Sequence, residues 1–262
     1  MRGWLTGLLC IGFVAACLVA IAASVAAIEM YKRAKISLLR PVETTIFAAE
    51  NRRVPRHTHE AGGPLRIVLI GDSRVAHWPS FGAALNWQVL NRGVAGETVA
   101  QLAYRFEQDA LDLDPDIIVL QSGGNDLIAA SLLRAGEAQA VVDETGHLLQ
   151  DLAEKAARRG ISVILTTIIP PAKPSLLRRV VWNDAVRSYV IELNAKLAAW
   201  SAPERVVVLD LTPIVGRESL LPAFRLDTVH LNEQAYAALS ARLADEIAAI
   251  VEARHPSQSP SN

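Results

Sequence analysis

Four short segments of the chain hold residue types that together can cleave an acyl bond. Gly71-Asp72-Ser73 follows an apolar run, and the Ser73 hydroxyl can act as a nucleophile when a base stands beside it. Asp227-Thr228-Val229-His230 lies near the other end of the chain. Histidine suits general-base work near neutral pH, and a carboxylate three residues earlier can fix its tautomer. Ser73, Asp227 and His230 are therefore candidate catalytic residues.

The other two segments offer donors for the negative charge that develops on an attacked carbonyl oxygen. The loop Asn91–Thr98 contains Gly96, whose backbone N–H can approach a substrate closely because glycine has no β-carbon. The segment Gln121–Leu127 contains Asn125, whose side-chain amide is a neutral donor. Together with the backbone N–H of Ser73 at the start of an expected helix, Gly96 and Asn125 form a candidate oxyanion hole.

Each segment also has a plain structural explanation when taken alone. Asp72 or Ser73 could cap a helix, and Gly96 could serve a turn that needs a positive φ. Asn125 could belong to a polar turn, and His230 could pack beside the last helix. The four segments occur in order, however, and three of them follow expected strands, so a shared catalytic site accounts for them more simply.

The elements that must position these residues follow from hydrophobic periodicity. Continuous apolar runs predict strands at Leu65–Ile70, Trp87–Leu90, Ile117–Gln121, Ser162–Thr167 and Val206–Asp210. Longer amphipathic patterns predict helices at Val99–Asp109, Gly136–Arg159, Val181–Ala199 and Asn232–Val251, the second ending at Gly160 in a left-handed cap. Alternation of buried strands and helices indicates an α/β fold, a three-layer α/β/α sandwich around a parallel sheet. In such sheets, sites form beyond the carboxyl ends of the strands.

The four segments resemble the sequence blocks of the SGNH (GDSL-like) hydrolase family, which read Gly-Asp-Ser, Asn-x-Gly-x-x-Gly, Gly-x-Asn-Asp and Asp-x-x-His. The resemblance spans about Leu65–Val251, and the thioesterase and lysophospholipase branch is the most similar. It implies a flavodoxin-like five-stranded sheet, no metal or organic cofactor, and cleavage of an ester or thioester through an acyl-enzyme on Ser73. The Gly-x-Ser-x-Gly elbow of α/β-hydrolases is absent, because residues 71–75 read Gly-Asp-Ser-Arg-Val.

The resemblance also implies a role for each candidate residue. His230 is the base, and Asp227 orients it. The backbone N–H groups of Ser73 and Gly96 and the amide of Asn125 bind the oxyanion. The substrate is expected to be a small acyl ester or a lipid. Two alternatives stay open: an O-acetyl esterase or acetyltransferase acting on envelope carbohydrate, and a non-catalytic, membrane-tethered binding module.

The N-terminal segment differs from the rest of the chain. No charged residue occurs from Gly3 to Ile28, which is about the length that crosses a bilayer as a helix. We expect a transmembrane anchor at 1–30, with a cleaved signal segment or lipid attachment at Cys17 as alternatives. The expected organisation continues with a linker at 31–64, a hydrolase domain at 65–253 and a disordered tail at 254–262.

Charge bears on both the location and the partners of the protein. Lys32, Arg33, Lys35 and Arg40 follow the apolar segment and favour a cytoplasmic domain, whereas exported hydrolases of this kind are common. We expect a single-pass protein of a bacterial inner membrane, with the extracytoplasmic side slightly favoured. Because 26 Lys and Arg balance 27 Asp and Glu without a long basic block, no nucleic-acid partner is expected.

Other chemically capable side chains carry less weight. Cys10 and Cys17 both lie in the apolar segment, which leaves the folded domain without a thiol. Arg74 and His77 follow the serine and are expected to be solvated, although either could contact an anionic substrate group. The remaining histidines lie in the linker, a helix and the tail, and no metal-ligand set is expected from them, namely from His57, His59, His147 and His255.

Overall fold

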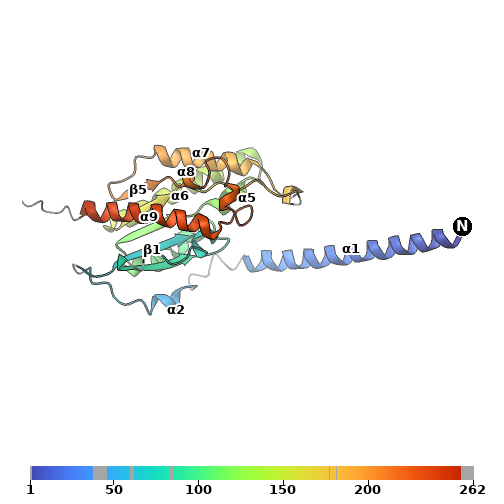
Figure 1. Cartoon of the computed structure of the whole chain (residues 1–262), viewed down its shortest axis with the longest axis horizontal. Coiled ribbons are helices and arrows are strands. Elements are labelled where there is room, and N and C mark those ends of the chain that lie inside the picture. Colours follow the sequence, from blue (N-terminus) through green and yellow to red (C-terminus); the bar gives the residue numbers. More distant parts are fainter. Residues whose placement is uncertain are drawn as a thin grey trace, which may run out of the picture. The chain divides into compact units, whose positions relative to one another are not determined.

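The computed structural model describes residues 2–37, 46–59, 62–82, 85–176, 178–180 and 182–254. The chain divides into two compact units, Met1–Glu43 and Thr44–Asn262. The first contains α1 (Arg2–Ser37), a single long helix that is drawn in blue in Figure 1. Its segment Cys10–Met30 is apolar and long enough to cross a membrane, a property that a signal sequence near an N-terminus shares.

The second unit is built on a five-stranded sheet with all neighbouring strands parallel. Its strands are β1 (Leu65–Gly71), β2 (Trp87–Gly93), β3 (Ile117–Gln121), β4 (Ser162–Thr166) and β5 (Val206–Leu209). They lie in the order β2-β1-β3-β4-β5, which is the flavodoxin-like arrangement. The α/β fold class predicted from the sequence is therefore confirmed.

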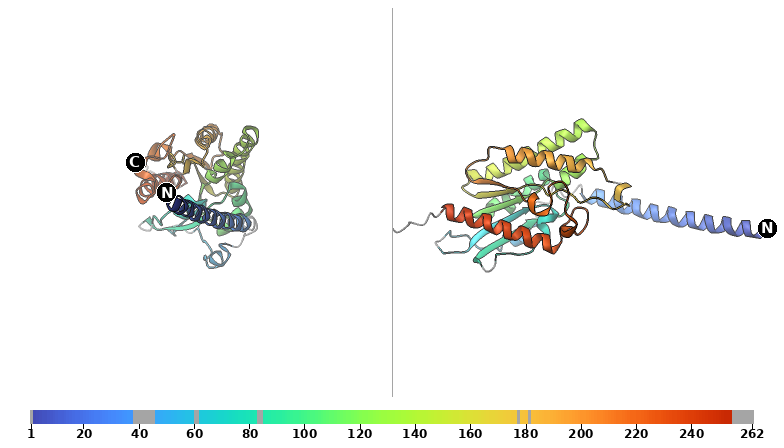
Figure 2. Two further views of the ribbon diagram at one scale, coloured as in Figure 1. Left: turned by 90° about the vertical axis from the view of Figure 1, so that its right-hand side faces the viewer. Right: turned by 45° about the horizontal axis from the view of Figure 1, so that its top comes forward.

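Helices cover both faces of this sheet (Figure 2). The α-helices of the unit are α2 (Ala48–Asn51), α3 (Ser73–Ala76), α4 (Val99–Asp109), α5 (Gly124–Ala130), α6 (Ala135–Arg158), α7 (Ala185–Ala199), α8 (Thr212–Val215) and α9 (Glu233–Arg254). Short 3-10 turns lie at Leu111–Leu113, Arg178–Val180 and Pro222–Phe224. Helix α6 ends as expected, because Gly160 follows it with a φ of 81°.

Strand β1 shows how the two faces form separate cores. Val68 and Ile70 point to the face that α4, α6 and α7 cover, where Phe106 is one of the largest buried side chains. Ile67 and Leu69 point to the other face and pack with residues of α8 and α9. Burying each such side chain contributes about 1.5–3 kcal/mol, so the sheet is held from both sides.

The strand order creates a topological switch point between β1 and β3. The chain leaves β1 toward β2 on one side and later enters β3 on the other side. At such a point the loops beyond the strand ends separate and leave room for a ligand. Gly71 at the end of β1 pairs with Gln121 at the end of β3, so the segments that follow these strands start side by side.

Part of the expected linker belongs to the second unit. Helix α1 continues to Ser37, and residues 46–59 contact the sheet domain. The Nδ2 atom of Asn51 donates to the carbonyl oxygen of Gln108 over 3.1 Å and to Oδ1 of Asp109 over 2.7 Å, while Val54 packs on the core. The expected tail lies outside the described residues, apart from Arg254, which ends α9.

Candidate active site

The segment after β1 forms a tight turn into α3. A β-carbon on Gly71 would overlap the carbonyl oxygen of Gln121, so only glycine fits where β1 meets β3. Asp72 is the N-cap of α3, and its Oδ1 accepts from the backbone N–H of Arg74 over 2.9 Å. Ser73 begins the helix and is partly exposed at the carboxyl edge of the sheet. The capping explanation therefore holds for Asp72, and it leaves the Ser73 hydroxyl for chemistry.

Asp72 connects the first and third sequence segments. Its side chain is buried, and burial raises the pKa of this carboxyl group. The charge of Arg74 and backbone N–H groups of Arg74 and Gly124 act against burial and lower the pKa. Since Gly124 directly precedes Asn125, the Asp72 carboxylate ties the turn that carries Ser73 to the turn that carries Asn125.

Arg74 is not a solvated residue, which corrects the expectation from the sequence. It is only 6% exposed, and its guanidinium spans from α3 to two other loops. Nε donates to the carbonyl oxygen of Val229 over 3.0 Å, and one terminal nitrogen donates to that of Ile169 over 2.6 Å. Because Val229 precedes His230, Arg74 holds the histidine loop against the helix that begins with Ser73.

The second sequence segment, Asn91–Thr98, starts inside β2 and contacts the backbone of α3. The Nδ2 atom of Asn91 donates to the carbonyl oxygens of Val75 over 2.7 Å and Trp78 over 3.2 Å, which caps the end of α3. A β-carbon on Gly93 would overlap the backbone of α3. Gly96 then adopts a φ of 79°, in the left-handed region that glycine occupies readily. Asn91 and Gly93 thus position α3, the helix that begins with Ser73, and Gly96 lies in the loop that follows β2.

Asn125 and Asp126 bind this loop to the start of α5. Asn125 Nδ2 donates to the carbonyl oxygen of Glu97 over 2.9 Å, so Asn125 is held beside the loop that contains Gly96. Both carboxylate oxygens of Asp126 accept from the backbone N–H of Val99 over 3.1 Å. Burial raises the pKa of Asp126 to about 6, although the Val99 N–H lowers it.

A buried ion-pair network lies below the Gly96 loop. The guanidinium of Arg105 contacts both carboxylate oxygens of Glu97, through Nε at 2.7 Å and a terminal nitrogen at 2.5 Å. A third nitrogen of Arg105 contacts Asp109 at 3.3 Å. Burial raises the pKa of Glu97, and the Arg105 guanidinium opposes that shift. Breaking one partner of such a network strands a buried charge, so the network fixes the loop firmly.

Asp227 and His230 form a directly hydrogen-bonded pair. Asp227 Oδ2 lies 2.8 Å from His230 Nδ1, and Oδ1 accepts the backbone N–H groups of Val229 at 2.7 Å and His230 at 2.8 Å. Partial burial raises the pKa of Asp227, but these three hydrogen bonds outweigh it and hold the pKa at about 2. The ionised carboxylate thus orients the imidazole and leaves Nε2 as the nitrogen for proton transfer.

His77 lies closer to this pair than the sequence indicated. It follows α3 and is exposed, and its ring packs edge-on against His230 with ring centroids 5.5 Å apart. Arg74 and His77 were both hard to place from sequence, because their partners lie about 95 to 155 residues further along the chain. The one available signal was their position, three residues apart, directly after the candidate nucleophile.

Comparison with models of protein families shows to which family the chain belongs. The model of the GDSL-like lipase/acylhydrolase family matches residues 58–238. The chain belongs to the GDSL-like lipase/acylhydrolase family. The matched range contains Ser73, Gly96, Asn125, Asp227 and His230. The family assignment supports an ester hydrolase activity, and it agrees with the resemblance found in the four sequence segments.

Solved structures share the fold of this GDSL-like chain. A candidate acylhydrolase of Bacteroides fragilis NCTC 9343 is 25% identical with a TM-score of 0.64, covering 80% of this chain and 97% of its own. A GDSL-like lipase of Bacteroides thetaiotaomicron VPI-5482 is also 25% identical, with a TM-score of 0.61 and coverage of 81% and 99%. Both similarities extend across the whole length of the solved chains.

A curated relative is similar over a shorter stretch. The uncharacterized lipoprotein YqeF of Bacillus subtilis (strain 168) is 32% identical over 127 residues. The similarity covers 42% of this chain and 51% of that protein. This GDSL-like chain therefore matches about half the length of that relative.

Proposed function

We propose that the protein hydrolyses carboxylic esters or thioesters through an acyl-enzyme on Ser73. The observation that carries the proposal is the Asp227–His230 pair, whose loop Arg74 fastens to the helix that begins with Ser73. This arrangement supplies a nucleophile, an oriented base and a carboxylate that stays ionised. It is the combination that two-step acyl transfer requires.

The proposed reaction begins when the Ser73 hydroxyl attacks the carbonyl carbon while His230 Nε2 takes the hydroxyl proton. Collapse of the tetrahedral intermediate breaks the bond to the alcohol or thiol, which leaves with that proton from His230. Water then attacks the acyl-enzyme, again giving its proton to His230, and the acid is released. Asp227 remains ionised throughout and stabilises the imidazolium in each step.

Three donors are proposed to bind the oxyanion: the backbone N–H groups of Ser73 and Gly96 and the amide of Asn125. Asn125 has two amide hydrogens, and the Glu97 carbonyl accepts from this nitrogen. The second hydrogen is therefore available to the substrate oxygen. Losing one such donor costs about 3–4 kcal/mol of barrier, so preorganisation by Glu97 matters to the rate.

We further propose that α1 anchors the protein in a membrane as a single span, with the catalytic domain on the extracytoplasmic side. The apolar segment Cys10–Met30 supports the anchor, and a curated relative is by its name a lipoprotein. A small acyl ester or a lipid is the proposed substrate, because a membrane-held esterase meets such molecules at the bilayer surface. No partner beyond substrate and membrane is proposed.

The test is hydrolysis of a p-nitrophenyl ester series, from acetate to laurate, by the full-length chain in detergent. Ser73→Ala is the control, and labelling by a fluorophosphonate reports the nucleophile independently. We expect turnover and labelling to vanish together in the variant. Equal turnover by wild type and variant would refute the serine mechanism. Activity confined to acetylated sugars would assign the carbohydrate O-acetyl esterase instead, and labelling without any turnover would favour acyl transfer.

A further inference from the structure

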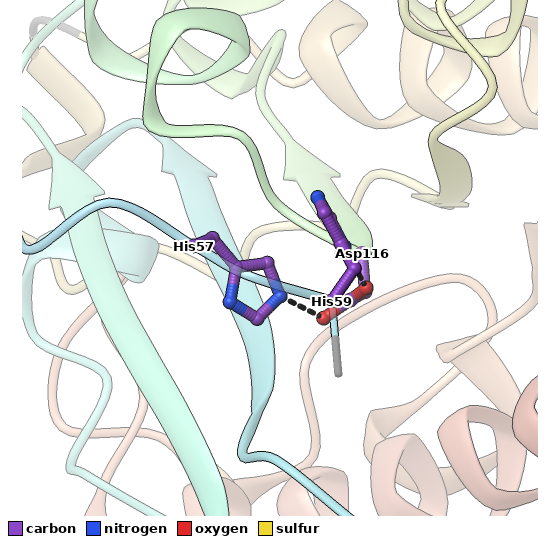
Figure 3. Close-up of side chains that lie close together, drawn as sticks. All are labelled: His57, His59 and Asp116. Atoms are coloured by element: carbon purple, nitrogen blue, oxygen red, sulfur yellow. Dashed lines mark hydrogen bonds and ion pairs between the residues drawn. The ribbon is translucent and has the colours of Figure 1, made fainter. Parts of the chain in front are cut away.

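Two histidines and an aspartate meet at the edge of the sheet opposite the candidate active site. His57 and His59 precede β1, and Asp116 precedes β3, so all three lie where strands begin. One ligand atom from each lies within 4.8 Å of the others. Figure 3 shows the three side chains close together, with the hydrogen bond between the His57 ring and the Asp116 carboxylate dashed.

We propose that His57, His59 and Asp116 bind a divalent transition-metal ion, with zinc as the best match. Imidazole nitrogen and carboxylate oxygen are zinc ligands, and three protein ligands with an open fourth position are a common arrangement. The donor set does not suit calcium or magnesium, which prefer oxygen ligands alone. This proposal does not depend on the proposed hydrolase activity.

The distances are close to those that zinc needs. His57 Nε2 lies 2.8 Å from Asp116 Oδ2, and His59 Nδ1 lies 3.0 Å from Asp116 Oδ1. In a tetrahedral site with bonds of about 2.0–2.2 Å, neighbouring ligand atoms stand about 3.3–3.6 Å apart. Each of these two nitrogen–oxygen pairs would have to open by roughly half an ångström for an ion to replace the shared proton. His59 has room to move, because 45% of its side chain is exposed.

Asp114 supplies the support that metal-binding histidines usually have. Its Oδ2 lies 3.1 Å from His59 Nε2, on the far side of the ring from Asp116. A carboxylate that accepts from one ring nitrogen leaves the lone pair of the other nitrogen for the metal. Asp116 is held as well, since its Oδ2 accepts the backbone N–H of Arg66 over 2.8 Å. The two ligands His59 and Asp116 are thus both oriented by neighbouring groups.

The site is also accessible from solvent. His59, Asp114 and Asp116 line one end of a cavity of about 750 Å³ at the start of the sheet. An ion can reach the ligands through this opening without unfolding the domain. Bound there, it would connect the segment that precedes β1 to the loop that precedes β3, two segments 57 to 59 positions apart in the chain.

The test is zinc binding to the full-length chain in detergent, followed by calorimetry and by thermal unfolding. We expect one zinc ion per chain and a rise in unfolding temperature of about 5 °C or more at saturating zinc. His57→Gln and His59→Gln should each weaken binding by more than about tenfold. Glutamine can still donate to Asp116 but is a poor zinc ligand, so the variants should unfold at the wild-type temperature in EDTA.

Two further variants make the result specific. His147→Gln removes an exposed histidine of α6 that lies outside the cluster, and it should bind zinc like the wild type. Asp114→Asn should weaken binding by about tenfold, because it changes only the support of His59. Zinc binding that is the same in wild type, His57→Gln and His59→Gln would overturn the proposal. So would a wild-type chain whose calorimetric signal and unfolding temperature do not respond to zinc.

Discussion

Asn125 can be tested separately from the other proposed oxyanion donors, because its N–H belongs to a side chain. One amide hydrogen is directed at the Glu97 carbonyl, which fixes the direction of the other. We expect Asn125→Ala to lower kcat about 100- to 1000-fold with little change in KM, because the donor acts mainly on the transition state. Steady-state kinetics on a p-nitrophenyl ester measure this. Gln139→Ala, which removes an amide from α6, should leave kcat unchanged, and normal turnover by Asn125→Ala would remove Asn125 from the mechanism.

The low pKa of Asp227 leads to a prediction about how kcat/KM depends on pH. Its pKa of about 2 keeps it ionised above about pH 4, so protonation of Asp227 does not contribute to a loss of activity there. We expect a plot of log kcat/KM against pH from about 8 to about 4.5 to contain no step from Asp227, and Asp126, with a pKa of about 6, is a carboxyl group of the site that titrates within this range. A step that disappears in Asp227→Asn would mean that Asp227 itself titrates in that range.

The hydrogen bonds of Asp227 also lead to a prediction about how the stability of the fold depends on pH. Because the folded pKa of Asp227 lies below its unfolded value, this group stabilises the fold above about pH 4, and the contribution is lost as the pH falls toward 2.

Asp227→Asn should reduce kcat by about 10³ to 10⁴, because the amide no longer fixes the required tautomer. Unreduced turnover at neutral pH would contradict the orienting role.

At the residue level, sequence patterns predicted where the candidate site residues lie in the fold, but not which residues support them. Ser73, Gly96, Asn125 and His230 all lie at the carboxyl edge of the sheet or in loops tied to it, as their positions after strands predicted. Arg74 was misjudged because nothing near it in sequence satisfies its guanidinium. Its partners are carbonyl oxygens of residues 95 and 155 positions away, which only the folded chain brings near.

At the level of elements, the contact between β2 and α3 gives a clean pair of substitutions. A β-carbon on Gly93 would overlap the backbone nitrogen of Ala76, whereas Gly136 on α6 has nothing within 4 Å of that position. We expect Gly93→Ala to destabilise the domain by about 3 kcal/mol or more and to lower kcat, because backbone must shift. Gly136→Ala should stabilise by up to about 1 kcal/mol. Thermal unfolding of both variants measures the change in stability. Equal changes in the two variants would show that α3 shifts to make room for the added β-carbon.

The sequence predicted the bounds of an element correctly where a local signal marks its end. Helix α4 has the predicted bounds Val99–Asp109, because Thr98 and Gln101 form a capping box at its start. The β2 strand is longer than predicted, since the polar Asn91, Arg92 and Gly93 still pair with β1. Helix α7 starts at Ala185 instead of Val181. Helix α5 was not predicted, because it is short and begins at a pair of glycines whose tertiary contacts stabilise it.

At the scale of the whole molecule, the apolar segment of α1 leads to a prediction about where the protein is located. We expect the full-length chain to remain in the membrane pellet after an alkaline carbonate wash, because the 21-residue apolar segment must stay out of water. N-terminal sequencing of the mature protein should begin near Met1. A mature chain that starts within residues 22–28 would instead identify a cleaved signal, and one that starts at Cys17 with a lipid attached would identify a lipoprotein.

The packing of residues 46–59 bears on how far the protein can be shortened for crystallisation or engineering. Asn51 accepts from Nε of Arg92 over 2.9 Å, and the ring of Phe47 lies under the guanidinium groups of Arg92 and Arg105. A fragment that begins at Leu65 would keep every proposed catalytic residue and yet open this buried charge cluster to water. Because Arg105 also binds Glu97, which follows Gly96, we expect this exposure to loosen the loop that carries the proposed oxyanion donor Gly96. A soluble fragment should therefore start at Thr44, where the compact unit begins.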